Sequence, residues 1–143
     1  LYIPLKEGYE STALTNAFMG LSFMISLARE LIKDMEDKKG DKLAGYKTLP
    51  ILVGDHISRI LTSLFIAIAM NMLYSSLWSN VSQHWALLSV FFIIQLSLFI
   101  SGVLMFVGFD YKISNKGFQR ASFLLKISMF LFIGLIFLMT FRI

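Results

Sequence analysis

Four acidic residues, Glu30, Asp34, Asp37 and Asp41, follow one another at intervals of four, three and four residues. On an α-helix, steps of three and four return to nearly the same face, so these carboxylates are expected to form one acidic stripe. Like charges in this arrangement repel one another and destabilise the helix unless a cation neutralises them. The pattern therefore predicts a cation-binding site.

The acidic stripe contains no His or Cys, and a set of carboxylates alone suits a hard cation, Mg²⁺ or Ca²⁺. The alternating ligand spacing of a calcium-binding loop is missing. Mg²⁺ typically takes one or two carboxylates and completes its shell with water and phosphate oxygens. Lys42 and Lys47 follow in a segment that contains Gly and Pro, where their charges can meet the oxygens of a phosphate. We therefore expect Mg²⁺ together with a phosphorylated ligand.

The local conformation at the stripe has two interpretations. We expect Gly40 to end or kink the helix and to turn Asp41 back toward the membrane, with an active-site loop over about residues 34–54. The alternative is a solvated helix end without a metal, in which opposite charges pair at i, i+4, for example Asp34 with Lys38. The alignment of the acids on one face favours the cation site.

The elements that carry these residues are expected to be membrane helices. Of the 143 residues, 57% are hydrophobic even without Gly, whereas soluble domains reach about 45–50% with Gly included. No charged residue occurs from Ile60 to Phe109. Four stretches are long enough to cross the bilayer core as helices, at about residues 13–31, 57–77, 85–109 and 121–141. A polar turn is expected before the first, at Lys6–Ser11. The predicted fold class is an all-α membrane protein, a multi-span transmembrane helix bundle.

The connections between the spans differ in charge. Lys and Arg are frequent between the first and second spans and between the third and fourth, but absent from the Tyr74–His84 connection. Cytoplasmic loops are enriched in these residues, so we expect an integral protein of the cell (inner) membrane whose active-site loop faces the cytoplasm. The absence of Cys excludes disulfides and thiolate metal sites. The net charge of +4 favours lipid head groups or a phosphorylated substrate, and no nucleic acid, as partners.

The segment Arg29–Pro50, followed by Gly54, resembles the second aspartate-rich motif of the UbiA-type intramembrane prenyltransferases. The resemblance implies a fold of about nine transmembrane helices, of which the four spans here are similar to the last four. It implies Asp37 and Asp41 as the Mg²⁺ ligands, with Asp34 as an additional catalytic acid. Lys42, Lys47 and Arg29 are then expected to bind the diphosphate of the substrate.

The activity implied by this resemblance is transfer of a polyprenyl group from a prenyl diphosphate, within membrane lipid. The acceptor is either a lipid phosphate similar to geranylgeranylglycerol phosphate or an aromatic ring of the 4-hydroxybenzoate or dihydroxynaphthoate type. The family's first aspartate-rich motif has no match in this chain, so we expect a C-terminal part of the enzyme that is inactive alone. A different function, a cation-binding transporter or channel subunit, would place carboxylates near the bilayer midplane rather than at a helix end.

Overall fold

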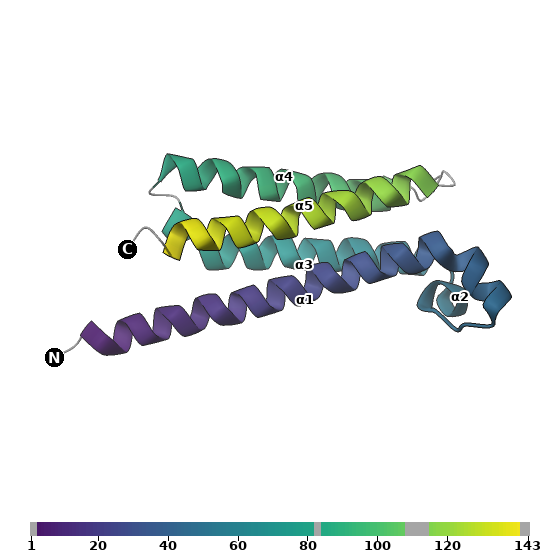
Figure 1. Ribbon diagram of the computed structural model, residues 1–143, viewed down its shortest axis with the longest axis horizontal. Helices are drawn as coiled ribbons and strands as arrows, with labels where there is room; N and C mark the ends of the chain where they lie inside the picture. Colours follow the sequence, from purple (N-terminus) through teal and green to yellow (C-terminus); the bar gives the residue numbers. More distant parts are fainter. Residues whose placement is uncertain (1–2, 82–83, 108–114, 141–143) are drawn as a thin grey trace.

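A computed structural model describes residues 3–81, 84–107 and 115–140 of the chain. Within these residues the elements are the helices α1 (Ile3–Ala44), α2 (Leu49–Val53), α3 (Asp55–Val81), α4 (Trp85–Val107) and α5 (Asn115–Thr140). The four long helices lie side by side in an elongated bundle, and α2 is a short helix beside the end of α1 (Figure 1). The described part of the chain contains no strand, which confirms the predicted all-α class.

Three of the helices are long and apolar enough to cross a membrane, over the segments Asp55–Trp78, Trp85–Phe106 and Lys116–Leu138. They coincide in position and composition with the spans predicted at 57–77, 85–109 and 121–141, although residues 108–109 and 141 lie outside the described part. The first predicted span, residues 13–31, lies within α1. Its first side chains are outside the described residues, so this fourth span stays a prediction.

Each long helix packs against two neighbours through a narrow apolar stripe. α1 and α4 both contact α3 and α5, which closes the bundle. On α1 the buried residues recur every three or four positions, as side chains that interlock between helices require: Leu21, Ile25, Ala28, Ile32 and Met35. The same spacing on α5 buries Phe118, Ala121, Leu125, Ser128, Phe132 and Leu135. These stripes hold the charged end of α1 against α3 and α5.

Two predictions about α1 are wrong. The helix is continuous from Ile3 to Ala44, so Lys6–Ser11 is helical rather than a turn, and Gly40 does not end the helix. A glycine inside a helix is less favourable than alanine by about 1 kcal/mol, which the strong helix formers around Gly40 offset. Residues 34–44 of the expected loop therefore belong to the last turns of α1.

The end of α1 is set by Gly45, whose φ of 79° lies in the left-handed region that favours glycine. The amide of Tyr46 donates to the carbonyl of Asp41 at 2.9 Å, and the amide of Gly45 donates to the carbonyl of Lys42 at 3.4 Å. These two contacts form a Schellman motif, which satisfies carbonyls that the helix leaves open. The connection to α2 is thereby reduced to residues 45–48.

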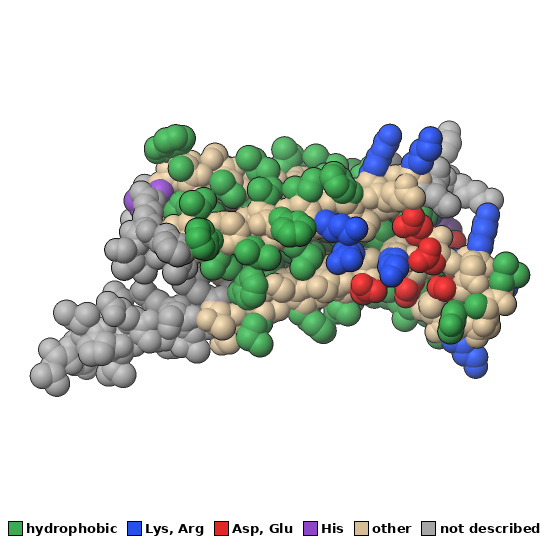
Figure 2. All heavy atoms as spheres, in the orientation of Figure 1, with side chains coloured by type: hydrophobic (Ala, Val, Ile, Leu, Met, Phe, Trp, Pro, Cys, Tyr) green, Lys and Arg blue, Asp and Glu red, His purple; other side chains and the backbone are tan. Residues whose placement is uncertain are grey.

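The two ends of the bundle differ in chemistry. Charged side chains gather over the half that includes the end of α1, and the other half of the face in view carries mainly apolar side chains (Figure 2). Trp78 and Trp85 lie at the opposite end, at the last turns of α3 and the start of α4, and both are exposed. Indole rings prefer the head-group region, so this distribution matches a bundle that crosses a bilayer.

Candidate active site

The acidic stripe lies on the last turns of α1, on the side that faces away from the bundle. At about 100° per residue, its centre is roughly 180° around the helix from the buried residues Ile32 and Met35. Glu30 and Asp37 are exposed, whereas Asp34 and Asp41 are partly buried. Acidic side chains gather near this end of the molecule, with basic side chains among them (Figure 2). The described helices thus supply one wall of a site.

The electrostatic cost of the stripe appears at Asp34. Partial burial raises the pKa of this carboxyl above the ordinary value of an aspartate, and the neighbouring charges of Asp41, Glu30 and Asp37 raise it further. The Lys33 ammonium lowers the pKa but does not reverse the shift. The ionised form of Asp34 is therefore disfavoured in the folded protein. A bound cation beside the stripe would stabilise this ionised form.

The stripe fits Mg²⁺ only as a partial ligand set. Among the described residues, no three Asp, Glu, His or Cys side chains lie close enough to hold a metal together. Successive acids are about one turn apart, which separates them by roughly 5 Å along the helix axis. One or two carboxylates with water and phosphate oxygens complete a Mg²⁺ shell. The donor set therefore fits Mg²⁺ bound together with a phosphorylated substrate.

The three basic residues predicted to bind diphosphate lie at different places. Lys42 is in the last turn of α1 and Lys47 is in the connection to α2; both are exposed, within a few residues of Asp41. Arg29 is partly buried and lies roughly a third of a turn around α1 from the stripe, on the flank nearest α5. The structure therefore brings Lys42 and Lys47 to the acidic end, but it does not align Arg29 with the stripe.

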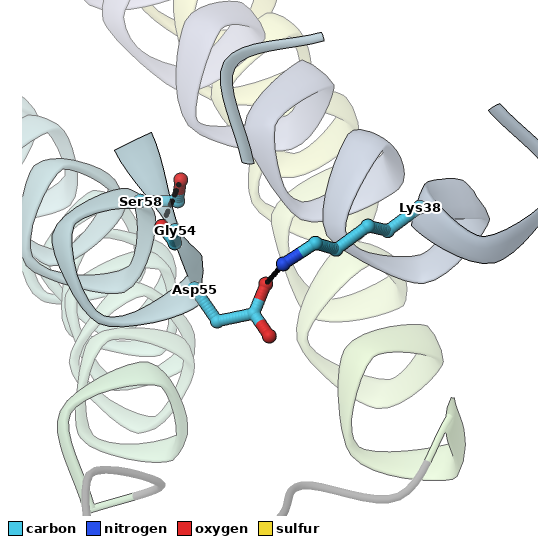
Figure 3. Close-up of polar contacts among 4 residues, drawn as sticks. All are labelled: Lys38, Gly54, Asp55 and Ser58. Atoms are coloured by element: carbon cyan, nitrogen blue, oxygen red, sulfur yellow. Dashed lines mark hydrogen bonds and ion pairs between the residues drawn. The ribbon is translucent and has the colours of Figure 1, made fainter. Parts of the chain in front are cut away.

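Two polar contacts fix the rotation of the charged end of α1. Glu36 accepts a hydrogen bond from the Gln119 amide of α5, with 3.0 Å between Oε1 and Nε2. On the other flank, the Lys38 ammonium forms an ion pair with Asp55 at the start of α3, with 2.7 Å between Nζ and Oδ1 (Figure 3). Together these contacts hold the stripe outward.

The Lys38 contact decides against part of the alternative interpretation of the sequence. Pairing of Lys38 with Asp34 at i, i+4 was the local expectation for a solvated helix end, but Lys38 pairs with Asp55, 17 residues further along the chain. The charge of Asp55 in the first turn of α3 was visible in the sequence. Its partner was not, because that pairing depends on how α3 packs beside α1.

Sequence reasoning also missed a buried cation beside the site. Arg59, in the second turn of α3, is only 7% exposed, and its guanidinium carbon lies 5.6 Å from the centre of the Phe118 ring of α5. A guanidinium over an aromatic face is attracted by the ring. Arg59 thus helps to hold α3 and α5 together.

Comparison with known proteins decides the family. The model of the UbiA prenyltransferase family matches residues 10–125, which is most of the chain and includes the whole acidic stripe. The chain belongs to the UbiA prenyltransferase family. This confirms the resemblance that the Arg29–Pro50 segment suggested.

Three curated relatives share one name. The digeranylgeranylglyceryl phosphate synthase of Methanothermobacter thermautotrophicus is 35% identical over 86 residues, which cover 60% of this chain and 27% of that protein. The synthase of the same name from Thermococcus kodakarensis is 33% identical over 111 residues, covering 77% of this chain and 37% of the relative. The one from Pyrococcus horikoshii is 46% identical over 44 residues, covering 31% and 16%.

The chain thus matches between 16% and 37% of the length of these UbiA relatives. No solved structure matches it.

Proposed function

We propose that this UbiA-family chain forms part of a Mg²⁺-dependent prenyltransferase that joins a prenyl group to a lipid-phosphate acceptor. The observation that carries the proposal is an outward-facing acidic stripe, with Lys42 and Lys47 beside it, at the charged end of a helix in a membrane bundle. The names of the relatives support a geranylgeranyl donor and a geranylgeranylglyceryl phosphate acceptor rather than an aromatic one. Family membership favours a transferase over a transporter or channel subunit.

The reaction breaks the allylic carbon–oxygen bond of the prenyl diphosphate, and the electron pair leaves with the diphosphate. The acceptor hydroxyl forms the new carbon–oxygen bond and loses its proton. In this proposal Asp37 and Asp41 would hold Mg²⁺, which would supply a Lewis acid for the charge of the leaving diphosphate. Lys42 and Lys47 add positive charge toward the non-bridging oxygens, where negative charge builds as the bond breaks.

Asp34 is the proposed acid–base or positioning residue. Its raised pKa makes the carboxylate a better proton acceptor than an ordinary aspartate, which suits removal of the proton from the acceptor hydroxyl. Asp34 lies between Glu30 and Asp37 on the stripe, so the repulsion between its carboxylate and that of Asp37 can also orient this proposed metal ligand. Arg29 is retained as a proposed diphosphate contact that would reach the substrate from the α5 flank.

The orientation in the membrane follows from the distribution of charge. The Lys- and Arg-rich end of the bundle is proposed to face the cytoplasm at the cell membrane, and the Trp78 and Trp85 end to face the opposite side. The diphosphate group of a donor at the cytoplasmic surface would then reach the stripe directly. Because the stripe faces away from these helices, it needs a second wall, and we propose that the 143 residues alone do not catalyse transfer.

The test of this proposal uses the complete enzyme in detergent, with geranylgeranyl diphosphate and geranylgeranylglyceryl phosphate as substrates. Asp37→Asn and Asp41→Asn should each lower Mg²⁺-dependent release of diphosphate by about 100-fold or more, since each removes a charge that stabilises the transition state. Glu36→Gln is the matched control, because Glu36 lies on the same turns but contacts Gln119 instead of facing outward. Full activity in both Asn variants would exclude these two residues as metal ligands.

A further inference from the structure

Lys38 lies at the edge of the acidic stripe, on the side of α1 that faces α3. It follows Asp34 by four residues and precedes Asp41 by three, and these are the spacings at which helix side chains contact one another. Its ammonium could therefore neutralise either Asp41, a proposed Mg²⁺ ligand, or Asp34, the proposed acid–base residue. In the structure it does neither, because it extends to Asp55 with 2.7 Å between Nζ and Oδ1 (Figure 3).

The position of Asp55 is well defined by the backbone around it. Asp55 is the first residue of α3, where the helix dipole stabilises a negative charge. The preceding Gly54 has a φ of 88°, and its carbonyl accepts hydrogen bonds from the Ser58 amide at 3.2 Å and the Ser58 hydroxyl at 2.9 Å. The acceptor for Lys38 is thus held at a constant place beside α1.

The ion pair between Lys38 and Asp55 is weak, so other carboxylates near Lys38 can compete with Asp55 for it. The side chains of Lys38 and Asp55 are 30% and 47% exposed, and exposed ion pairs contribute little to stability. A pairing of Lys38 with Asp34 or Asp41 would have similar strength. Because these ion pairs are of similar strength, loss of the Asp55 carboxylate would leave Lys38 to pair with Asp34 or Asp41 instead.

We propose that Asp55 holds Lys38 away from the acidic stripe and thereby keeps a competing ammonium off Asp41, a proposed Mg²⁺ ligand, and off its neighbour Asp34. Asp55 is in this sense a positioning residue, since it acts on the site through Lys38 and does not touch the substrate. The inference rests on the proposed function, in which the stripe binds Mg²⁺. It differs from a purely structural role, in which the ion pair would only fasten α1 to α3.

The two roles predict different orders among three variants of the complete enzyme. If Asp55 sequesters Lys38, Asp55→Asn should raise the Mg²⁺ concentration for half-maximal activity by about twofold to fivefold, because the released lysine competes with the metal. Lys38→Met should leave that concentration unchanged or lower it. The double variant Lys38→Met/Asp55→Asn should return to the wild-type value, because the competing charge is gone.

If the ion pair only fastens the helices, all three variants should shift alike, and the double variant should not recover; that result would overturn the inference. Lys39→Met is the matched control, because Lys39 is exposed and its spacing from Asp34 and Asp41 does not bring it beside either. Thermal unfolding of each variant with and without Mg²⁺ gives a readout that does not depend on activity. The rise in melting temperature on adding Mg²⁺ should need more Mg²⁺ in Asp55→Asn than in the wild type and should recover in the double variant.

The outcome also separates this inference from the proposed function. A wild-type enzyme whose transfer needs no divalent cation would overturn both. A wild-type enzyme that needs Mg²⁺, together with an Asp55→Asn variant whose Mg²⁺ dependence is unchanged, would overturn only the role of Asp55.

Discussion

Gly40 and Gly45, five residues apart near the end of α1, allow a test in which the same substitution has opposite effects. Gly40 lies inside the helix, whereas Gly45 follows it with a φ of 79°. A methyl group added at either position would meet no atom within 4 Å. The consequences of Gly40→Ala and Gly45→Ala are therefore conformational, without a steric contribution.

The expected magnitudes follow from these two backbone conformations. Alanine is more favourable than glycine in a helix interior by about 0.8–1.0 kcal/mol, so Gly40→Ala should stabilise the protein by about that amount. An alanine in the left-handed region is disfavoured by about 1–2 kcal/mol, so Gly45→Ala should destabilise it. At about 2–4 °C per kcal/mol for a chain near this size, the two melting temperatures should move a few degrees in opposite directions.

The assay is thermal unfolding in detergent, followed by far-ultraviolet circular dichroism. Hydrogen exchange at the amide of Tyr46, which donates to the carbonyl of Asp41, gives a local measure of the same cap. It should become faster in Gly45→Ala and stay unchanged in Gly40→Ala. If Gly40→Ala were the destabilising variant and Gly45→Ala were neutral, the helix would end at Gly40, and our account of the site's backbone would be refuted.

Two further predictions concern the charge and the packing of the bundle. The raised pKa of Asp34 means that its ionised form disfavours the folded state at neutral pH, and that this cost disappears as the pH falls through the folded-state pKa toward 3.8. Asp34→Asn should therefore raise the melting temperature at pH 7 without Mg²⁺, by an amount that vanishes in acid; a constant gain at all pH values would contradict this cause. Between α4 and α5, the Ser97 and Ser128 hydroxyls lie 2.6 Å apart, and Ser128→Ala should cost only about 0.6 kcal/mol, because Ser97 can still donate to the carbonyl of Ile94. Leu125 is fully buried near Ser128, and Leu125→Ala should lower the free energy of unfolding by about 2–5 kcal/mol because it leaves a cavity. Chemical unfolding measures both variants. Equal losses in Ser128→Ala and Leu125→Ala would show that the hydroxyl contact matters more than we expect.

Local patterns were sufficient for the spans and for the membership of the acidic stripe. A run of apolar residues long enough to cross a bilayer is visible without knowing its neighbours, which is why the predicted spans coincide with the long apolar helices α3, α4 and α5. The spacing of Glu30, Asp34, Asp37 and Asp41 places them on one face of any helix that contains them. The family was likewise evident from the segment around the stripe.

Local patterns failed where two similar signals compete. Gly40 and Gly45 are both reasonable ends for α1, and the difference between them amounts to about 1 kcal/mol of backbone preference. The sequence pointed to Gly40, but in the structure the helix ends at Gly45. The hydrogen bond from the Tyr46 amide to the Asp41 carbonyl stabilises that end. The stripe is therefore fully helical instead of bending at Asp41.

The sequence by itself determined that this is a membrane helix bundle with four carboxylates in register, because hydropathy and helical period act between residues close in the chain. Only the tertiary structure decided where that stripe points and which charge Lys38 meets. Both depend on how α3 and α5 pack on α1: the buried face of Ile32 and Met35 turns the acids outward, and Asp55 comes within 2.7 Å of the lysine. A contact between residues 17 positions apart has no periodic signature, since it forms only when two helices are already in place.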